Sequence, residues 1–422
     1  MPKRTPLYAL VALSLSCAGL GSQDVAHAAC QSSAPSPATK AISQVLASAV
    51  ERGDTPGVVA LVVDRKGCVF EDSSGKLDVA HDAPLSSNAI FRIASMTKPV
   101  TSVAIMILLE QGKLSLDDPV SKYLPAFAKL QVLTHFNEGD GTYETRPAKR
   151  PMTIRHLLTH TSGMGYAFSN PTVAALVKLT HKAEWELPLL HDPGETWMYS
   201  PSPAVLGFIV EKISGTSLDE FFRRHIFAPL EMQDTSFAVP LDKQARVITV
   251  YEHVDGKFQD LAQPPIPAAP TPPFRGDGGL YSTADDYGRF LRMLLGRGQL
   301  GHVRILSARS VQLMGQNQIG VIVVSQQPAA DPARTRPFPL GAGRDKFGLG
   351  FQITASSTEG SKSRSQGSLS WAGIYNTEFW IDPQRGIGGV LLMQFLPFYD
   401  AGAIRTLKDF ENTVNEDLDR GP

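Results

Sequence analysis

Hydrophobic positions near the start of the chain change from helical to strand spacing. Residues 41–50 carry apolar side chains at helical intervals. Residues 57–64 (GVVALVVD) form a continuous β-branched run, and residues 68–71 follow after the turn sequence RKG. Runs of this kind are typical of buried strands. We therefore expect a helix followed by a pair of strands.

The middle of the chain is predominantly helical in its spacing. Residues 99–111 are apolar around most of the surface that a helix would present, which predicts a buried helix. Helical spacing dominates again from residue 153 to about residue 231. Residues 128–151 are polar and contain Gly-Asp-Gly, so they predict a surface loop.

Strand periodicity returns in the last quarter of the chain. The expected strands are residues 349–354, 368–371, 377–382 and 387–394, followed by a helix from about 401 to 418. Two stretches carry neither period. Residues 264–273 (PPIPAAPTPP) are too rich in proline for a helix or a central strand, and residues 326–345 are irregular. We interpret both as walls of a cleft.

The order of elements is strands, a helical middle, strands and a final helix. Terminal strands on both sides of a helical insert favour one sheet that both ends of the chain share, with helices covering it. This is an α/β (α+β) fold class. The chain shows no internal repeat.

The first residues predict a signal peptide rather than part of the fold. Lys3 and Arg4 precede an apolar run at residues 7–20, and Ala-His-Ala at 26–28 is a cleavage site of the usual kind. We expect a signal peptide at 1–28, a Ser/Pro/Ala-rich linker at 29–40 and one domain at 41–422. A buried N-terminal helix and a lipoprotein anchored at Cys17 are the alternatives. No later segment has the ~18 uninterrupted apolar residues of a membrane span. The mature chain is therefore expected to be periplasmic or secreted.

Composition excludes little except a polyanionic partner. The 422 residues are 42% hydrophobic and 19% charged, with 40 basic and 41 acidic side chains. This balance is ordinary for a globular protein and disfavours nucleic acid as a partner. Removal of the signal peptide would leave Cys30 and Cys68. In an oxidising compartment they can pair, or they can be one terminal thiol and one buried strand cysteine, and the sequence leaves both open.

Candidate chemistry begins at residues 91–99 (FRIASMTKP). Ser95 and Lys98 are three residues apart at the start of the predicted buried helix, so they share one helical face. Unpaired amide groups at a helix N-terminus also favour a developing negative charge, which suits a nucleophilic hydroxyl. The spacing alone is weak evidence, because Ser73 and Lys76 share it in a predicted turn. The alternative for Ser95 is a helix cap with Lys98 as a surface charge.

Two further segments supply groups that such a nucleophile needs. Tyr199 follows Trp197 in the sequence PGETWMYSPSPAV, and a nearby ammonium can lower the pKa of its phenol so that it shares proton transfer with Lys98. Trp371 and Gly373 end a predicted strand, where small residues allow close approach to a ligand. We expect the amides of Ser95 and Ile374 to face an oxyanion. Ordinary packing of Tyr199 and Trp371 is the alternative.

Several ordered motifs make the chain resemble the serine β-lactamase-related superfamily, which includes class C β-lactamases, penicillin-binding carboxypeptidases and esterases. Ser-x-x-Lys at 95–98 is similar to its catalytic motif. LLTHTSG at 157–163, PGETWMYS at 193–200 and GDGGLYSTA at 276–284 resemble further family segments in the expected order. The similarity extends from about residue 40 to the C-terminus.

The resemblance implies a mixed antiparallel sheet flanked by N- and C-terminal helices, with an inserted all-helical subdomain at about 96–274. It also implies that Ser95, Lys98 and Tyr199 form the catalytic group and that no cofactor or metal is needed. Two departures matter. Tyr-Ser-Pro at 199–201 replaces Tyr-x-Asn, and Trp-Ala-Gly at 371–373 replaces Lys-Thr-Gly, which removes a cation for a substrate carboxylate. The Trp-x-Gly form is similar to that of the superfamily's carboxylesterases.

The sequence therefore predicts a carboxylesterase acting on a small-molecule ester through an acyl-enzyme on Ser95. The alternatives are a β-lactamase or D-alanyl carboxypeptidase and a non-catalytic penicillin-binding-like module. We do not expect His156 and His160 to bind a metal, because no Glu follows His156. Turn or capping roles are expected for Glu195 and Asp277, and the alternative is that they orient site residues. The acyl chain, the alcohol and the oligomeric state are not determined by the sequence.

Overall fold

An eight-stranded sheet forms the centre of the protein. The structure is a computed structural model that describes residues 37–356 and 364–419. The strand order is β12-β13-β14-β15-β16-β1-β2-β3, and all neighbours are antiparallel. The strands are β1 (Gly57–Asp64), β2 (Cys68–Asp78), β3 (Ala83–Pro84), β12 (Lys346–Phe347), β13 (Gln352–Ile353), β14 (Leu369–Gly373), β15 (Thr377–Asp382) and β16 (Ile387–Leu392). The predicted sheet shared by both ends of the chain is confirmed.

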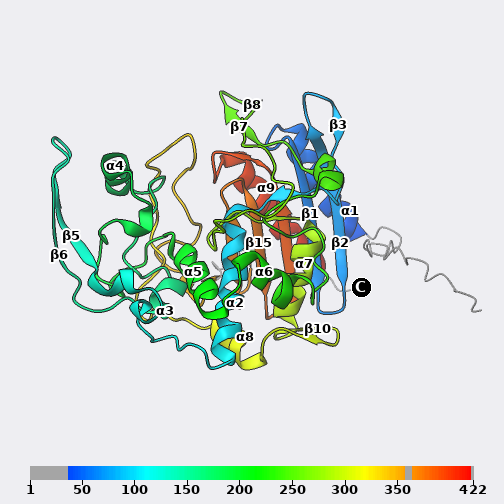
Figure 1. Cartoon of the computed structure of the whole chain (residues 1–422). Helices are drawn as coiled ribbons and strands as arrows, with labels where there is room; N and C mark the ends of the chain where they lie inside the picture. Colours follow the sequence, from blue (N-terminus) through cyan, green and yellow to red (C-terminus); the bar gives the residue numbers. More distant parts are fainter. Residues whose placement is uncertain (1–36, 357–363, 420–422) are drawn as a thin grey trace, which may run out of the picture.

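Helices cover both faces of this sheet, as Figure 1 shows. The terminal helices α1 (Pro37–Glu51) and α9 (Ala401–Asp419) lie side by side on one face. Helix α7 (Ala284–Leu295) covers the other face. Even-numbered side chains from 58 to 62 pack with α1 and α9, whereas odd-numbered side chains from 59 to 63 belong to the core on the other side. Because both faces of β1 are covered in this way, its sequence is a continuous apolar run.

The segment between the two parts of the sheet is mainly helical. Its helices are α2 (Thr97–Glu110), α3 (Ile154–Leu158), α4 (Pro171–Thr180), α5 (Ser202–Ser214) and α6 (Leu218–Phe222), and α8 (Ala308–Met314) follows α7. Residues 97–108 of α2 are all buried, which confirms the predicted buried helix. Helix α2 is thus the centre of the second half of the molecule rather than a surface helix.

This insert is not entirely helical. Residues 128–151, expected to be a loop, contain the hairpin β5 (Gln131–Phe136) and β6 (Tyr143–Pro147). Val132 is buried on one side of that hairpin. Side chains alternate between the two faces of a strand, so even a largely polar segment can form strands when one face is covered. A second hairpin, β7 (Tyr251–Val254) and β8 (Lys257–Asp260), joins β17 (Phe395–Leu396) in a small sheet.

The strand expected at 349–354 is reduced to β13. Gly350 has a φ of +96°, and a Cβ there would lie 2.2 Å from Ser102 Oγ of α2. The backbone turns at this point to pack against α2, so regular pairing begins only at Gln352. The edge of the sheet beside β14 is consequently short.

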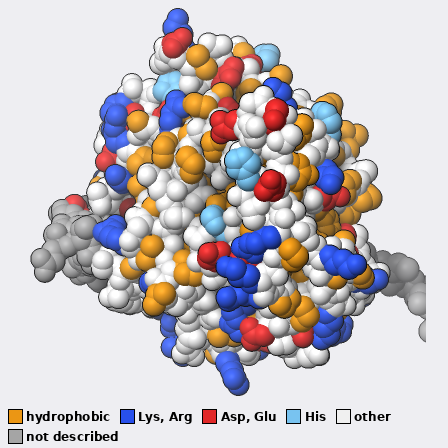
Figure 2. Space-filling view, turned by 90° about the vertical axis from the view of Figure 1, so that its left-hand side faces the viewer, with side chains coloured by type: hydrophobic (Ala, Val, Ile, Leu, Met, Phe, Trp, Pro, Cys, Tyr) orange, Lys and Arg blue, Asp and Glu red, His pale blue; other side chains and the backbone are white. Residues whose placement is uncertain are grey.

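Cys68 at the start of β2 is disulfide-bonded. Cys30 and the predicted signal peptide lie outside the described residues. None of the helices formed by residues 37–356 and 364–419 has the length and hydrophobicity to cross a bilayer. On the face shown in Figure 2, basic and acidic side chains are interspersed with hydrophobic ones.

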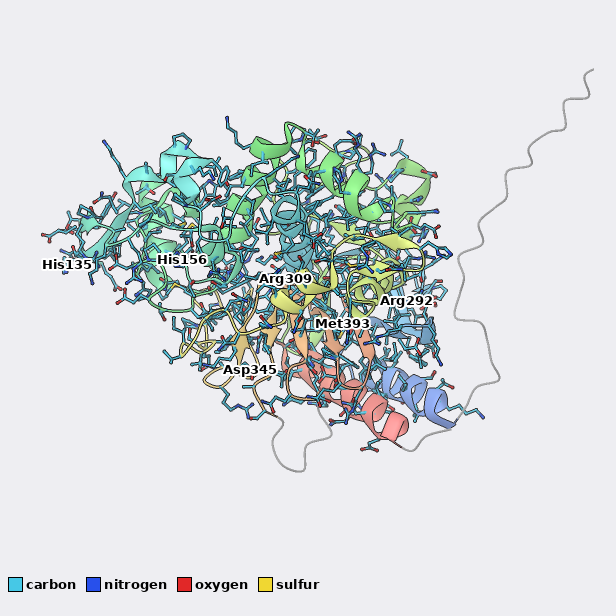
Figure 3. The ribbon with its side chains drawn as sticks, turned by 90° about the horizontal axis from the view of Figure 1, so that it is seen from below. His135, His156, Arg292, Arg309, Asp345 and Met393 are labelled. Carbon is cyan, nitrogen blue, oxygen red and sulfur yellow. The ribbon has the colours of Figure 1, made fainter. Side chains whose placement is uncertain are left out.

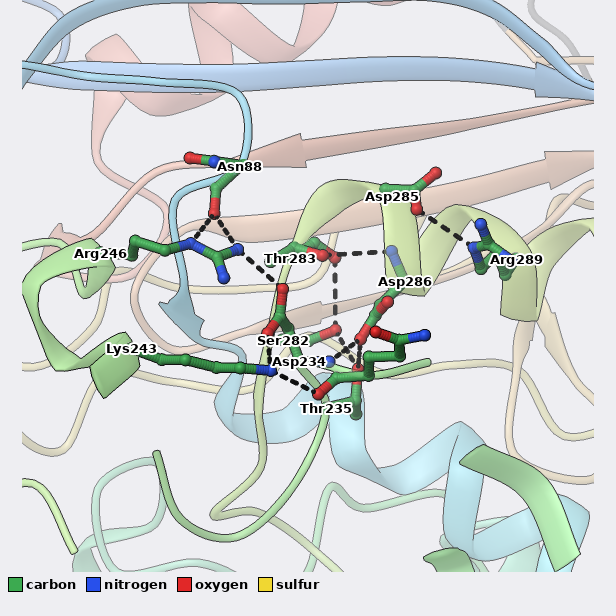
Figure 4. Close-up of polar contacts among 11 residues, drawn as sticks. Asn88, Asp234, Thr235, Lys243, Arg246, Ser282, Thr283, Asp285, Asp286 and Arg289 are labelled. Atoms are coloured by element: carbon green, nitrogen blue, oxygen red, sulfur yellow. Dashed lines mark hydrogen bonds and ion pairs between the residues drawn. The ribbon is translucent and has the colours of Figure 1, made fainter. Parts of the chain in front are cut away.

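A buried charge network fixes the segment that leads to α7 (Figure 4). The Asp234 carboxylate accepts hydrogen bonds from Lys243 Nζ and Arg246 Nη2, both at 2.7 Å. The Asp234 amide donates to Asp286 Oδ2 at 2.7 Å, and Thr283 caps α7 by accepting from the Asp286 amide at 3.2 Å. Strand β9 (Tyr281–Ser282) lies directly before this cap and pairs with β4 (Phe91–Arg92), three residues from Ser95. The network therefore holds the backbone that approaches Ser95.

We predict that Asp234→Asn lowers the free energy of unfolding by about 2 kcal/mol, because two cations lose a buried anionic partner. Urea denaturation followed by circular dichroism measures the change. The matched control is Asp242→Asn, since Asp242 is exposed in the same segment and should leave stability within about 0.5 kcal/mol of wild type. Equal effects of the two substitutions would contradict the role given to the network.

Candidate active site

Ser95 and Lys98 lie together at the start of α2. Ser95 belongs to a single 3₁₀ turn, Ala94–Met96, that runs directly into the helix. Lys98 Nζ is 2.9 Å from Ser95 Oγ and donates a hydrogen bond to the carbonyl oxygen of Asp277 at 2.7 Å. The proximity predicted from their spacing is therefore present. Lys98 is only 2% exposed, so it is not the surface charge of the alternative interpretation.

Burial lowers the pKa of Lys98 to about 7. The carboxylates of Asp277 and Glu184 act in the opposite direction, and the Arg275 guanidinium adds to the lowering. Desolvation is the largest of these effects because the ammonium has lost its water. Near neutral pH the side chain is consequently present both as an ammonium and as a free amine.

The second Ser-x-x-Lys pair lies in a strand rather than the expected turn. Ser73 and Lys76 are both in β2, where residues three apart point to opposite faces. Ser73 Oγ donates to the carbonyl of Leu85 at 3.1 Å, and Lys76 Nζ pairs with Asp82 at 2.7 Å. The identical spacing brings no hydroxyl and amine together here, because the backbone is extended.

Tyr199 lies beside this pair and is buried. Lys98 Nζ is 4.8 Å from the centre of its ring, and Ser95 and Tyr199 line the same cavity. Burial raises the pKa of Tyr199 above its ordinary value, while its contacts with Ser95 and Trp371 act in the opposite direction. The expectation of a lowered pKa is therefore wrong. The phenol, neutral at pH 7 even at its ordinary pKa, is thus held further from ionisation by its burial.

The end of β14 forms the opposite wall. The Trp371 ring lies 5.0 Å from that of Tyr199. Its indole N–H is near the phenol, but the geometry falls short of a hydrogen bond and no other described residue accepts from it. A Cβ on Gly373 would lie 2.4 Å from the carbonyl oxygen of Ile93, so glycine lets β14 approach the segment before Ser95. Ile374 follows and lines the cavity with Ser95.

Asp277 is part of the site, contrary to the turn or capping role expected for it. Its carboxylate accepts hydrogen bonds from Tyr166 Oη at 2.6 Å and from Arg275 Nε and Nη2 at 2.9 and 2.6 Å. The side chain is fixed in this way while its carbonyl oxygen accepts from Lys98. Tyr166 and Arg275 were not predicted from the sequence. The Arg-x-Asp pair within a glycine-rich motif was the one local signal. Glu195 does have a turn role, accepting from the Asp192 amide at 3.0 Å.

His156 and His160 make different structural contacts. His160 is 2% exposed, and its Nδ1 lies 3.1 Å from Ser200 Oγ, which in turn lies 2.8 Å from Ser202 Oγ. Burial lowers the pKa of His160 well below its ordinary value. His156 instead forms a capping box with Thr153 at the start of α3. Ser200 is thus held in the interior, away from the cavity that Tyr199 lines.

Two cavities meet at Ser95. The first, of about 430 Å³, has an aromatic wall that includes Phe168, Tyr199, Phe338 and Trp371. The second, of about 960 Å³, is more open and is lined partly by residues of the segment 264–273. The first cavity is bounded by residues of the segment 326–345, so both irregular stretches form walls as predicted. Figure 3 labels Asp345 in that segment and, at a distance from it, His135 on the β5–β6 hairpin.

A serine hydroxyl at hydrogen-bond distance from a buried amine, beside a neutral phenol, is a site of the serine hydrolase type. It lies here between an antiparallel sheet and a helical half, as in β-lactamase/transpeptidase-like folds. The Beta-lactamase family model matches residues 42–411. The chain belongs to the beta-lactamase family.

Relatives with esterase and acyl-transfer names are among the similar proteins. A protein of Mycobacterium tuberculosis is 36% identical over 82% of this chain and 88% of its own length. Lovastatin esterase of Penicillium rubens is 28% identical, over 86% of this chain and 94% of its own. The structure of a simvastatin synthase mutant from Aspergillus terreus has a TM-score of 0.78 and 26% identity, covering 91% of this chain and 96% of that one.

We predict that Lys98→Met changes the pH dependence of stability. Between pH 7 and about 10 the unfolded chain keeps a proton on Lys98 that the folded protein has released, so raising the pH stabilises the wild type relative to the variant. Any stability advantage of Lys98→Met should be largest below pH 7 and should fall by about 1.4 kcal/mol per pH unit above it. Urea titrations of both proteins at several pH values measure this, and a constant difference would refute it.

Proposed function

We propose that the chain is an exported carboxylic ester hydrolase that acts on small-molecule esters through an acyl-enzyme on Ser95. The observation that carries the proposal is the 2.9 Å approach of Lys98 Nζ to Ser95 Oγ, with the pKa of Lys98 lowered to about 7. An amine of this kind is a base at neutral pH. The esterase name of one relative and the synthase name of another support chemistry on esters.

In the proposed acylation, the Ser95 hydroxyl gives its proton to the neutral Lys98 amine as its oxygen bonds to the ester carbonyl carbon. The carbonyl oxygen becomes an oxyanion, which the amides of Ser95 and Ile374 stabilise in this scheme. When the bond to the alcohol oxygen breaks, the Lys98 ammonium returns the proton to that oxygen through the Tyr199 phenol. Tyr199 acts as a relay in this scheme because its raised pKa keeps it protonated.

Deacylation repeats these steps with a different nucleophile. Water gives a proton to Lys98 and attacks the acyl carbon, and the proton then returns to Ser95 Oγ. A second alcohol in place of water would give a new ester by the same route. The more open cavity beside Ser95 supplies a way in for either one.

Two features favour esters over β-lactams. Pro201, at the place of the family's asparagine, carries no side-chain amide and lines neither cavity at Ser95. Trp371, at the place of the family's lysine, offers no cation for a β-lactam carboxylate. A β-lactamase or D-alanyl carboxypeptidase remains the second candidate because of the family. The predicted signal peptide at 1–28 supports a periplasmic or secreted location, which cell fractionation would test.

We predict that Ser95→Ala reduces kcat/KM on short-chain p-nitrophenyl esters by about 10³-fold or more, because the acyl-enzyme cannot form. The matched control is Ser73→Ala, which removes the serine of the other Ser-x-x-Lys pair and should keep nearly full activity. Initial rates at 405 nm (a wavelength set by the nitrophenolate product) measure both. Equal rates for Ser95→Ala and wild type would exclude Ser95 as the nucleophile.

Two further measurements separate the alternatives. Turnover of a chromogenic cephalosporin at a rate comparable with ester turnover would favour a β-lactamase. A stable covalent adduct in intact-mass spectra, without released product, would favour a non-catalytic penicillin-binding-like module.

We predict that kcat/KM rises with pH through a midpoint near 7, because the Lys98 amine is the base. Asp277→Asn should move this midpoint to lower pH by about one unit, since it removes an anion that raises the pKa of Lys98 and leaves Arg275 unneutralised. The pH profile with an ester of non-ionising acid and alcohol measures the shift. A midpoint that stays fixed or rises would contradict this role for Asp277.

A further inference from the structure

The outer edge of β14 is only partly paired. Strand β13 contacts β14 through the pairs Gln352–Ser370 and Ile353–Leu369, and its two residues end there. The rest of β14, residues 371–373, has no partner on that side among the described strands. A cavity can therefore pass around this edge from one face of the sheet to the other.

The aromatic cavity at Ser95 does pass around it. Trp371 is opposite Phe379 in the β14–β15 ladder, whereas Ala372 is opposite Glu378. Neighbouring residues of a strand point to opposite faces, so Trp371 and Glu378 belong to different faces. Both line the same cavity of about 430 Å³. It begins at Ser95 on the α2 side and ends on the side of α9.

The far end of this cavity contains an unpartnered acid. Glu378 is 6% exposed within a strand whose other side chains are buried as well. Its carboxyl group makes no hydrogen bond or ion pair with any residue in the described ranges. A buried carboxyl without a partner is costly, which points to a ligand group that completes it.

Donors and cations surround this acid. Arg364 donates to Glu411 of α9 through Nε at 2.8 Å and through Nη2, and its Nη1 makes no hydrogen bond to a described residue. Besides Tyr199 at the Ser95 end, the other charged or titratable residues lining the cavity are Lys408, also of α9, Arg344, Asp345 and Tyr399. Burial raises the pKa of Glu378 to about 8, Arg364 acts to lower it and Glu411 to raise it. At pH 7 the carboxyl group is mainly protonated and is itself a donor.

We propose that this end of the cavity is a subsite for a carboxylate at the far end of the substrate's acyl chain, held by Glu378 and Arg364. The proposal rests on the proposed function. Both side chains offer donors, and three cations, Arg344, Arg364 and Lys408, line the cavity. An alkyl end would leave both donors unsatisfied, and an ammonium would meet like charge.

The order of the reaction steps assigns the acyl chain, rather than the alcohol, to this cavity. The alcohol has to leave and water has to enter while the acyl group is still bonded to Ser95. The second cavity, which is larger and more open, provides that exchange, whereas the first is smaller and leads to Glu378. A dicarboxylic acid bound as its half-ester fits this arrangement.

The test compares mono-p-nitrophenyl esters of dicarboxylic acids, from succinate to sebacate, with p-nitrophenyl alkanoates of equal chain length. At one or two chain lengths the wild type should favour the carboxylate-ended ester by about tenfold or more in kcat/KM, mainly through KM. Glu378→Leu should remove this preference, whereas the matched variant Glu378→Gln, which keeps a donor, should retain it. Each variant's preference is expressed as the ratio of its own two kcat/KM values, so a change in its general activity does not enter the comparison.

The preference should also depend on pH with a defined sign. Above about pH 8 Glu378 ionises and repels the substrate carboxylate, so the wild-type ratio of the two kcat/KM values should fall. Taking the ratio cancels the titration of Lys98. In Glu378→Gln the ratio should stay constant over the same range.

Several outcomes would overturn the proposal. They are the absence of a preference at every chain length, a preference that survives Glu378→Leu, and a preference for ω-ammonium esters that Glu378→Gln abolishes. If no ester is hydrolysed, the proposed function fails, and the subsite is tested by calorimetry. Monomethyl esters of the same diacids should then bind Ser95→Ala at least about tenfold more tightly than they bind the Ser95→Ala/Glu378→Leu double variant. Equal affinities would refute the subsite on its own.

Discussion

The burial of one amino group is the constraint on which the rest of the structure depends. Lys98 has lost its water, so its amine needs acceptors that the protein supplies, and it finds them in Ser95 Oγ and the carbonyl of Asp277. That carbonyl stays in place because Tyr166 and Arg275 fix the Asp277 side chain. The apolar surface of α2 is what keeps water from the amine. The packing around α2 therefore determines both the position of the Lys98 amine and its basicity.

The backbone around the amine shows what this packing requires. Ala94, directly before Ser95, has a φ of +43°, a conformation unfavourable for any residue with a Cβ. Gly276 lies so close to α5 that a Cβ would be 2.3 Å from the carbonyl oxygen of Pro203, and its own carbonyl accepts from Thr101 Oγ1 of α2 at 2.6 Å. The glycine-rich motif thus brings the Asp277 carbonyl between two helices. Its glycines serve close approach rather than flexibility.

Local sequence patterns predicted the structural features that depend on residues close together in the chain. The bounds of β1 and β15, the burial of α2 and the approach of Lys98 to Ser95 all follow from side chains a few residues apart. The contacts of Asp277 could not be found in this way, because 111 residues separate it from Tyr166 and 179 from Lys98. The direction of the Tyr199 pKa was mistaken for the same reason, since the rings that enclose it come from distant segments.

Polar groups in and around the cavities at Ser95 divide into those with hydrogen-bond partners and those without, and the division has a physical meaning. Lys98 and Asp277 are fully engaged and so resist movement, which suits groups that must be positioned before a substrate arrives. The indole N–H of Trp371 and the carboxyl of Glu378 have no acceptor or partner in the described residues, yet both line the cavity. A fold with an extensive apolar core on both sides of its sheet tolerates two such costs. A bound ligand that satisfied either group would recover part of that cost as affinity.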